Sequence, residues 1–137
     1  MNNNFKFIDL FCGLGGFRIA LEKQNCNCVF SSDIDKAVAQ VYENNFGEYP
    51  SGDITKIDSN EIPDFDILCG GFPCQSFSIA GKRLGFEDSR GTMFFEVARI
   101  LKEKKPKAFI LENVKGITNH DNGKTLETIL TILDGLG

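Results

Sequence analysis

The chain has 137 residues, of which 42% are hydrophobic and 25% charged, and its net charge at pH 7 is −4. This length and composition predict one soluble globular domain without a signal peptide or any apolar run near the roughly 20 residues that span a bilayer, so we expect a cytoplasmic protein. The acidic net charge argues weakly against a nucleic-acid partner.

Strand and helix patterns alternate along the chain with short connections, which predicts a Rossmann-like α/β fold, a parallel sheet with helices on both faces. In chain order, strands are expected at residues 5–11, at 28–31, near 52–54, at 65–69 and at 108–111. Helices are expected from Phe17 onward, along the buried stripe of Ala37, Val38, Val41 and Tyr42, over 93–101 and over 126–133. Asp33 or Asp35 is expected to cap the second helix, which Gly47 ends. The sheet would thus stop after about five strands, with the fifth as an unprotected edge.

Four reactive or charged side chains come directly after strand patterns: Asp33, Asp53, Cys74 and Glu112. In open α/β sheets, ligands bind at the carboxyl ends of the strands. Because these ends meet at one edge of a parallel sheet, we expect the four side chains to form the rim of an active site within a single domain, residues 1–137.

Residues 13–16 form a glycine-rich turn between the first strand and the first helix. Glycines there permit a tight turn and the close approach of a ligand to main-chain N–H groups. Arg18 stands where the dinucleotide fingerprint needs its third glycine, so a purely structural turn remains an alternative. Asp33 lies near the roughly 20-residue offset at which an acid binds a ribose hydroxyl, and the two features together favour an adenosine-type cofactor. Asp53 is interpreted as an acceptor for the adenine amino group, with a simple turn residue as the alternative.

Cys74 follows Pro73 and precedes polar residues, whereas Cys69 lies within its strand pattern. A thiolate is the reactive form, and the cations of residues 81–91 would favour it, although this segment also fits a simple flexible surface loop. No histidine adjoins Cys74, which argues against a Cys–His hydrolase. Glu112 is expected to be partly desolvated, with its pKa raised so that it can donate a proton. The alternative is a surface acid paired with a lysine.

The five cysteines and the single histidine indicate neither a disulfide framework nor a metal site. The cysteine count is odd, and Cys26 and Cys28 are separated by one residue rather than the two to four that are usual in zinc sites. The cysteines other than Cys74 are therefore predicted to be small core residues.

Taken in order, these motifs resemble those of the cytosine-5 DNA methyltransferases, the bacterial modification enzymes especially. The resemblance runs through nearly the whole chain and includes Asp9-Leu10-Phe11, Gly13-Leu14-Gly15-Gly16, Gly52-Asp53-Ile54, Pro73-Cys74-Gln75, residues 85–91 and Glu112-Asn113-Val114. It implies methyl transfer from S-adenosylmethionine to carbon 5 of cytosine in DNA through a covalent Cys74 adduct. It also implies that this chain is an incomplete catalytic domain, without a target-recognition region and a C-terminal segment, and inactive alone.

The resemblance assigns roles by motif position. Cys74 would be the nucleophile, and Glu112 would protonate or hydrogen-bond ring nitrogen 3 of cytosine. The cofactor-binding residues that it implies are Phe11, Gly13, Leu14, Gly15, Gly16, Asp33, Ile34, Asp53, Ile54 and Pro73. The substrate-binding residues that it implies are Phe72, Gln75, Ser78, Arg90 and Asn113. Ile34 stands where the family often has a larger apolar or aromatic residue, so a thinner contact with adenine is expected.

The implied partner is double-stranded DNA with its target cytosine flipped out of the helix. The part that reads DNA would be supplied by another region, such as a second polypeptide, and no membrane is involved. Two alternatives stay open: a cytosine-5 methyltransferase acting on transfer RNA, and a non-catalytic nucleotide-binding module with a nicotinamide cofactor. Arg18 and the Pro73-Cys74 pair argue against the second of these.

Overall fold

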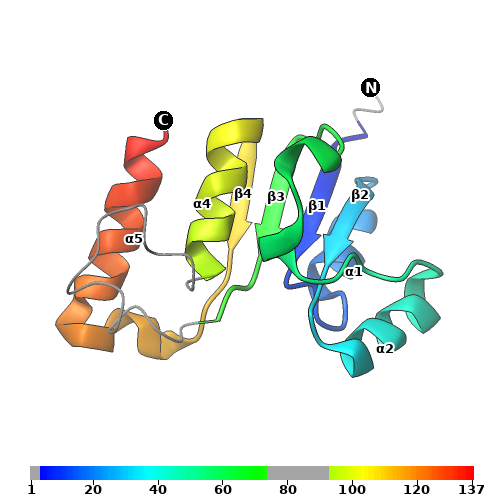
Figure 1. Ribbon diagram of the computed structural model, residues 1–137, viewed down its shortest axis with the longest axis horizontal. Helices are drawn as coiled ribbons and strands as arrows, with labels where there is room; N and C mark the ends of the chain where they lie inside the picture. Colours follow the sequence, from blue (N-terminus) through cyan, green and yellow to red (C-terminus); the bar gives the residue numbers. More distant parts are fainter. Residues whose placement is uncertain (1–3, 74–92) are drawn as a thin grey trace.

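The computed structural model describes residues 4–73 and 93–137, which contain a four-stranded sheet in the order β2-β1-β3-β4 (Figure 1). The strands are β1 (Lys6–Leu10), β2 (Asn27–Ser32), β3 (Ile67–Gly70) and β4 (Ala108–Leu111). The α-helices of these residues are α1 (Gly16–Glu22), α2 (Lys36–Phe46), α4 (Met93–Lys104) and α5 (Lys124–Gly135). Short 3₁₀ helices form at η1 (Ile54–Lys56), η2 (Ser59–Glu61), η3 (Lys115–Thr118) and η4 (His120–Gly123). All three strand pairs are parallel, so the predicted fold class is confirmed.

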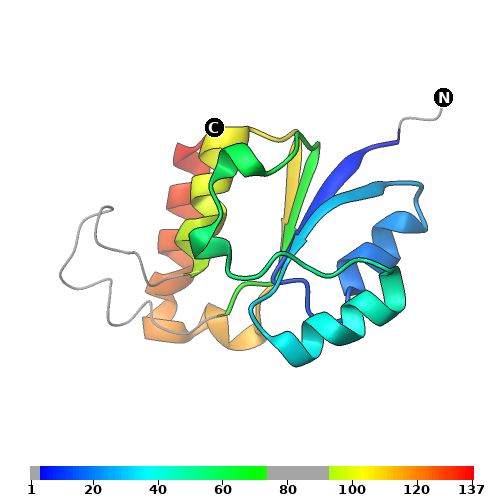
Figure 2. The ribbon, with the colours of Figure 1, turned by 45° about the vertical axis from the view of Figure 1, so that its right-hand side comes forward.

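Helices cover both faces of the sheet, with α1 and α2 on one side and α4 and α5 on the other (Figure 2). The alternation of side chains along β1 explains this arrangement, because successive residues of a strand point to opposite faces. Phe7 belongs to an apolar cluster with Cys26 and Cys69, against which residues of α1 pack. Ile8 and Leu10 belong to a larger cluster that includes the buried side chains of α4. The sheet is therefore the middle layer of three.

The strand predicted near residues 52–54 is wrong. Ser51 forms one isolated bridge with Ser32, and the chain then turns into η1. Asp53 is the N-cap residue of this 3₁₀ helix: its side chain accepts a hydrogen bond from the main-chain N–H of Thr55. The described residues consequently hold four strands rather than about five.

The buried stripe predicted for α2 is shifted. Ala39 and Tyr42 are buried, whereas Ala37 and Val41 are exposed. Asp35, one of the two predicted caps, fixes the start of the helix by accepting from two main-chain N–H groups, and Gly47 ends the helix as predicted. This start directs Tyr42 rather than Val41 toward the sheet.

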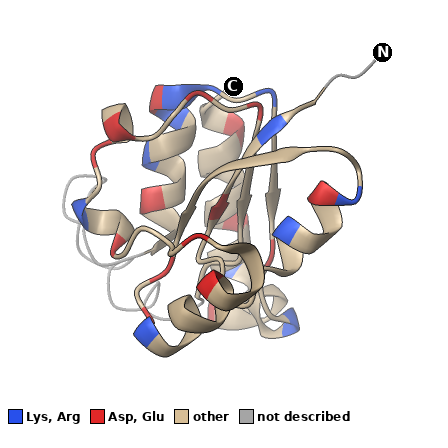
Figure 3. Ribbon diagram, turned by 90° about the vertical axis from the view of Figure 1, so that its right-hand side faces the viewer, with Lys and Arg blue, Asp and Glu red and all other residues tan. Residues whose placement is uncertain are grey.

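The remaining helices lie close to their predicted positions. α4 ends at Lys104, before Pro106, as the sequence predicts. In α5, Ile129 is buried, but Leu130 is exposed although its pattern predicted burial. No helix of residues 4–73 and 93–137 has both the length and the apolar character needed to cross a membrane. Acidic and basic residues are interspersed along the described ribbon (Figure 3).

Candidate cofactor and active site

The carboxyl ends of β1 and β2 border a cavity of about 210 Å³. Six residues predicted to bind the cofactor line it: Phe11, Asp33, Ile34, Asp53, Ile54 and Pro73. Its other lining residues, which were not among the predicted site residues, are Ser32, Gly52, Thr55 and Met93. The structure thus brings together predicted residues that lie up to 62 positions apart in the sequence, as Phe11 and Pro73 do.

Asp33 joins the cavity to the glycine-rich turn. Its Oδ2 accepts a hydrogen bond of 2.9 Å from the N–H of Gly13, and its Oδ1 accepts one of 2.9 Å from the N–H of Asp35. The N–H of Cys12 donates to the carbonyl of Ser32 at 3.0 Å, which holds the same two segments together. A carboxylate oxygen has two lone pairs, so each oxygen of Asp33 can still accept from a ligand hydroxyl.

Phe11 holds a left-handed backbone conformation at the mouth of the cavity, with φ 53°. Side chains other than glycine rarely adopt this region, and residues held there against their preference cluster at binding sites. The conformation reverses the chain immediately after β1. It sets a half-buried aromatic ring against the cavity.

Gly15 has a packing role that the sequence did not reveal. Its φ is 88°, and a Cβ built on it would overlap the Phe46 ring, lying 2.6 Å from Cζ, and lie 3.2 Å from Cε2 of Tyr42. Gly16 has no such neighbour within 4 Å. Leu14, between Gly13 and Gly15, is exposed. None of the three lines the cavity, so their predicted cofactor contacts stay predictions.

Asp53 carries a negative charge at the cavity. Its Oδ1 accepts from the main-chain N–H of Thr55 at 3.0 Å and from the Thr55 hydroxyl at 2.7 Å. These hydrogen bonds from Thr55 lower the pKa of Asp53 below its ordinary value. Because both bonds go to Oδ1, the second oxygen can accept from an amino group of a ligand.

The ends of β3 and β4 lie side by side and bring Glu112 to Gly71. The N–H of Glu112 donates to the carbonyl of Gly70 at 3.0 Å, and a Cβ on Gly71 would lie 3.0 Å from Oε2 of Glu112. The Asn113 side chain donates to the carbonyl of Phe72 at 2.8 Å. Glu112 therefore stands beside the main chain that leads to Pro73 and Cys74.

One expectation at these strand ends needs correction. Glu112 is exposed, so the partial desolvation expected from its apolar neighbours is wrong. The Phe72 ring is buried against Phe94 with ring centroids 5.4 Å apart, and its expected contact with the substrate stays a prediction. Phe72 is a core residue whose carbonyl, held by Asn113, fixes the path of the chain. Four other predicted site residues lie outside the described residues: Cys74, Gln75, Ser78 and Arg90.

Arg18 is the main polar contact that the sequence did not predict. Its guanidinium is buried and pairs with Glu48 at 2.9 Å and with Glu22 at 2.8 Å. It also lies 4.7 Å from the centroid of the Phe46 ring and donates to the Tyr42 hydroxyl at 3.4 Å. Arg18 thus links α1 to α2 and to the segment after α2. The two aromatic residues that it contacts also lie next to Gly15 of the glycine-rich turn.

Asp9, on β1, is fully buried, and neither of its carboxylate oxygens has a hydrogen-bond partner within residues 4–73 and 93–137. Burial raises the pKa of Asp9 to about 7, with the Arg18 charge opposing this shift and the Asp33 charge adding to it. The same cause raises the pKa of Cys12 and Cys28, and it raises that of Cys69 to about 12. These three thiols stay protonated and, as the sequence predicted, serve as buried or half-buried packing residues.

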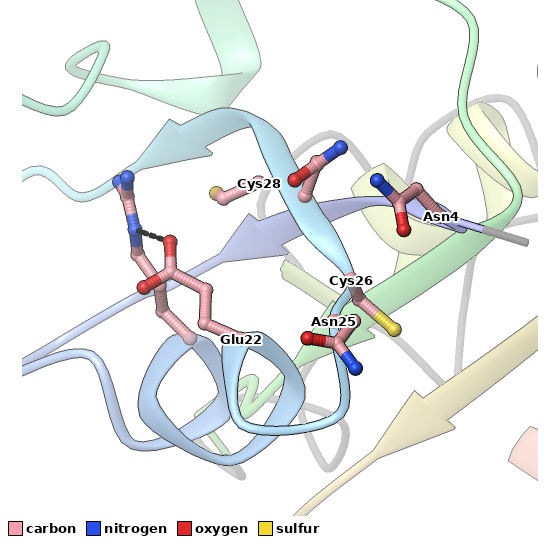
Figure 4. Close-up of a pocket in the computed structure, with 7 residues that line it drawn as sticks. Asn4, Glu22, Asn25, Cys26 and Cys28 are labelled. Atoms are coloured by element: carbon pink, nitrogen blue, oxygen red, sulfur yellow. Dashed lines mark hydrogen bonds and ion pairs between the residues drawn. The ribbon is translucent and has the colours of Figure 1, made fainter. Parts of the chain in front are cut away.

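A larger cavity, of about 510 Å³, lies near the opposite ends of the strands, where β2 begins (Figure 4). Asn4, Asn25 and Cys26 come to it from segments that precede β1 and β2, and Glu22 comes from the end of α1. None of its seven lining residues is a predicted site residue. The site predicted from the sequence is therefore the smaller cavity.

Comparison with known proteins identifies the family of the chain. The family model for C-5 cytosine-specific DNA methylase matches residues 5–137. The chain is 60% identical over 131 residues to the Type II methyltransferase M.HhaI of Haemophilus parahaemolyticus, and 62% identical over 133 residues to M.NgoBI of Neisseria gonorrhoeae. These matches cover 96% and 97% of this chain but only 40% and 42% of the relatives.

Solved structures share the fold. A variant of Spodoptera frugiperda DNMT2 superimposes with a TM-score of 0.70 and 26% identity, covering 95% of this chain and 40% of that one. The Entamoeba histolytica methyltransferase EhMeth gives 0.68 and 24%, covering 97% and 44%. With the family model matching almost every residue, the chain belongs to the C-5 cytosine-specific DNA methylase family.

Proposed function

We propose that this chain is the catalytic part of an enzyme that transfers a methyl group from S-adenosylmethionine to carbon 5 of cytosine in DNA. The observation that carries the proposal is the cavity at the ends of β1 and β2, lined by six of the residues that the motifs assign to the cofactor. The identity of 60% or more to Type II methyltransferases such as M.HhaI and M.NgoBI supports DNA, rather than transfer RNA, as the substrate.

The residues at the cavity fit an adenosine cofactor. Asp33 has lone pairs left for ribose hydroxyls, ionised Asp53 can accept from the adenine amino group, and Phe11 offers an aromatic ring. S-adenosylmethionine bound there would supply an electrophilic methyl group for the cytosine ring. The glycine-rich turn is held by Asp33 so that its N–H groups and its tight path are fixed before a ligand binds.

The proposed chemistry uses Cys74 and Glu112 to make carbon 5 of cytosine nucleophilic. The Cys74 thiolate adds to carbon 6, breaking the double bond between carbons 5 and 6 and moving electron density toward carbon 5 and nitrogen 3. Glu112 donates a proton or a hydrogen bond to nitrogen 3 and so stabilises the adduct. After methylation, loss of the proton on carbon 5 and departure of the Cys74 sulfur restore the aromatic ring. The target base has to leave the duplex for these groups to reach it.

We further propose that the chain does not methylate DNA without another part of the enzyme. It spans about two fifths of the length of the relatives it matches. Its net charge of −4 gives the chain no net attraction for DNA phosphates, and acidic and basic residues are interspersed along the described ribbon (Figure 3).

The proposal is tested by covalent trapping on DNA that contains 5-fluorocytosine, with the remaining part of M.HhaI supplied. Fluorine cannot leave as the carbon 5 proton does, so a Cys74 adduct should persist as a protein–DNA band under denaturing conditions. The wild-type chain should form this band and Cys74→Ser should not. Trapping by Cys74→Ser would show that Cys74 is not the nucleophile. Trapping on transfer RNA but not on DNA would show that transfer RNA is the substrate.

Gly71→Ala should reduce methylation while leaving the fold intact. The new Cβ would lie 3.0 Å from Oε2 of Glu112, so the carboxylate has to move by a few tenths of an ångström. We expect activity in the same supplemented assay to fall roughly tenfold, with the free energy of unfolding changed by less than about 1 kcal/mol. Gly116→Ala is the matched control, because nothing lies within 4 Å of a Cβ there. Equal activity for the two variants would mean that catalysis does not depend on the position of the Glu112 carboxylate.

Ile34→Trp should strengthen cofactor binding. Ile34 lines the cavity yet is 73% exposed, and an indole ring would offer an aromatic face to adenine. We expect the affinity for S-adenosylmethionine, measured by isothermal titration calorimetry, to rise about two- to tenfold. Ile19→Trp, at an exposed position of α1 outside the cavity, should leave it unchanged. An unchanged affinity for Ile34→Trp would place adenine elsewhere.

A further inference from the structure

We propose that Phe46, the last residue of α2, is a positioning residue for S-adenosylmethionine: its ring holds the glycine-rich turn of residues 13–16 in the shape that receives the methionine part of the cofactor. The inference rests on the proposed function and adds a residue from outside the set that lines the cavity. The observation behind it is that one segment, residues 33–46, contacts the turn at two separate points.

Residues 33–46 hold the turn near both of its ends. At the first end, Asp33 accepts a hydrogen bond of 2.9 Å from the N–H of Gly13. At the other end, the Phe46 ring lies so close to Gly15 that a Cβ there would be 2.6 Å from Cζ. A hydrogen bond of 2.9 Å from the Gly15 N–H to the Cys12 carbonyl closes the turn. Because packed atoms cannot overlap, the ring limits how far the main chain of Gly15 can move toward α2.

The Phe46 ring is held in place by its own neighbours. Its centroid lies 4.6 Å from that of the Tyr42 ring, and Tyr42 is fully buried. The Arg18 guanidinium lies 4.7 Å from the Phe46 centroid and also pairs with Glu48, just beyond the end of α2, at 2.9 Å. The ring therefore has a fixed position from which it limits the turn. Because Phe46 is only half-buried, the chain should still fold when this side chain is shortened.

The methionine part of the cofactor is the part that the turn would contact. Asp33, the proposed ribose acceptor, contacts the turn directly through Gly13. In S-adenosylmethionine, adenine and the methionine part are attached at different carbons of the ribose. With adenine at Asp53, the methionine part is therefore expected toward the turn. Its carboxylate is an anion, which main-chain N–H groups of a turn can bind. A displaced turn would weaken this contact and leave the adenosine contacts intact.

Isothermal titration calorimetry of the chain with two ligands tests this role. S-adenosylmethionine carries the methionine part, whereas 5′-methylthioadenosine has the same adenosine and sulfur but lacks the amino-acid group. Phe46→Ala should lower the affinity for S-adenosylmethionine about tenfold, the factor expected for one hydrogen bond to a charged group, and that for 5′-methylthioadenosine less than about twofold. Phe46→Leu, which keeps more of the apolar volume, should give a smaller loss that again affects S-adenosylmethionine more.

Phe5→Ala is the matched control for the loss of an aromatic ring. Phe5 is 38% exposed and precedes β1, at the end of that strand away from the turn. Its variant should bind both ligands like wild type. Circular dichroism of each variant checks that it is folded.

Amide hydrogen exchange without ligand provides the second measurement. The Gly15 N–H should exchange faster in Phe46→Ala, because its bond to the Cys12 carbonyl loses the ring that backs it, while the amides of β1 exchange as in wild type. Unchanged affinity for S-adenosylmethionine, an equal loss for both ligands, or unchanged exchange at Gly15 would overturn this inference alone. A wild-type chain that does not bind S-adenosylmethionine would overturn the proposed cofactor and this inference with it.

Discussion

Gly15→Ala is expected to destabilise the protein by about 2 to 5 kcal/mol, the sum of two separate effects. The left-handed φ of 88° disfavours any residue with a Cβ, which costs about 1–2 kcal/mol. The new methyl group would also overlap the Phe46 ring and press on Tyr42, and overpacking of this kind costs about 1–3 kcal/mol. Urea unfolding at 25 °C, followed by circular dichroism, measures the difference.

Gly16→Ala is the control for this prediction. Gly16 begins α1, and no atom lies within 4 Å of a Cβ at that position. Alanine there should leave stability unchanged or raise it slightly, by less than about 1 kcal/mol. If the two variants lose the same stability, the destabilisation does not come from the Phe46 contact and the backbone conformation of Gly15.

The comparison of Gly15 with Gly16 shows where sequence reasoning ends. The run of glycines predicted a tight turn that positions a ligand, and the turn and its tie to Asp33 are present. The sequence could not show that one of these glycines is required by a ring 31 positions later, Phe46. The same holds for the pair between Arg18 and Glu48, which leaves no local periodic signal.

Elements with a strong local pattern were the predictable part of the fold. β4 is bounded as predicted because an apolar run follows Pro106 and ends at Glu112. The strand expected near Asp53 failed because a short side chain that hydrogen-bonds its own backbone competes with strand pairing. The exposure of Phe109 and Ile110 agrees with the edge position that the sequence predicted for the last strand.

The cavity was predictable to the extent that its residues end strands. Phe11 and Asp33 directly follow β1 and β2, and the parallel topology brings these ends together, whereas Asp53 caps a 3₁₀ helix. Met93 begins a helix and carries no such signal. The sequence did not show that the Phe72 ring packs in the core, because an aromatic residue beside a glycine turn fits a binding site and a core contact equally well. Asp9 is conspicuous only in three dimensions, where its burial becomes visible.

Asp9→Asn is expected to make the protein more stable than wild type at pH 8 and to lose that advantage near pH 4. The folded-state pKa of Asp9 is about 7, against an ordinary value of 3.8, because burial disfavours the charged carboxylate more than Arg18 favours it. Between these two values the folded chain binds more protons than the unfolded chain, so the stability of the wild type falls as pH rises from about 4 to 7 and then levels off. The amide that replaces the carboxyl group in Asp9→Asn stays neutral throughout, so the variant lacks this dependence on pH.

The expected gain at pH 8 relative to pH 4 is on the order of 4 kcal/mol, from about three pKa units at 1.36 kcal/mol each. The measurement is the difference in free energy of unfolding between variant and wild type across pH 4–8, in which titrations common to both chains cancel. Asp64→Asn, at an exposed carboxylate, is the control and should follow wild type within about 1 kcal/mol. A pH-independent difference for Asp9→Asn would mean that Asp9 is charged in the folded protein, with a partner that offsets its burial.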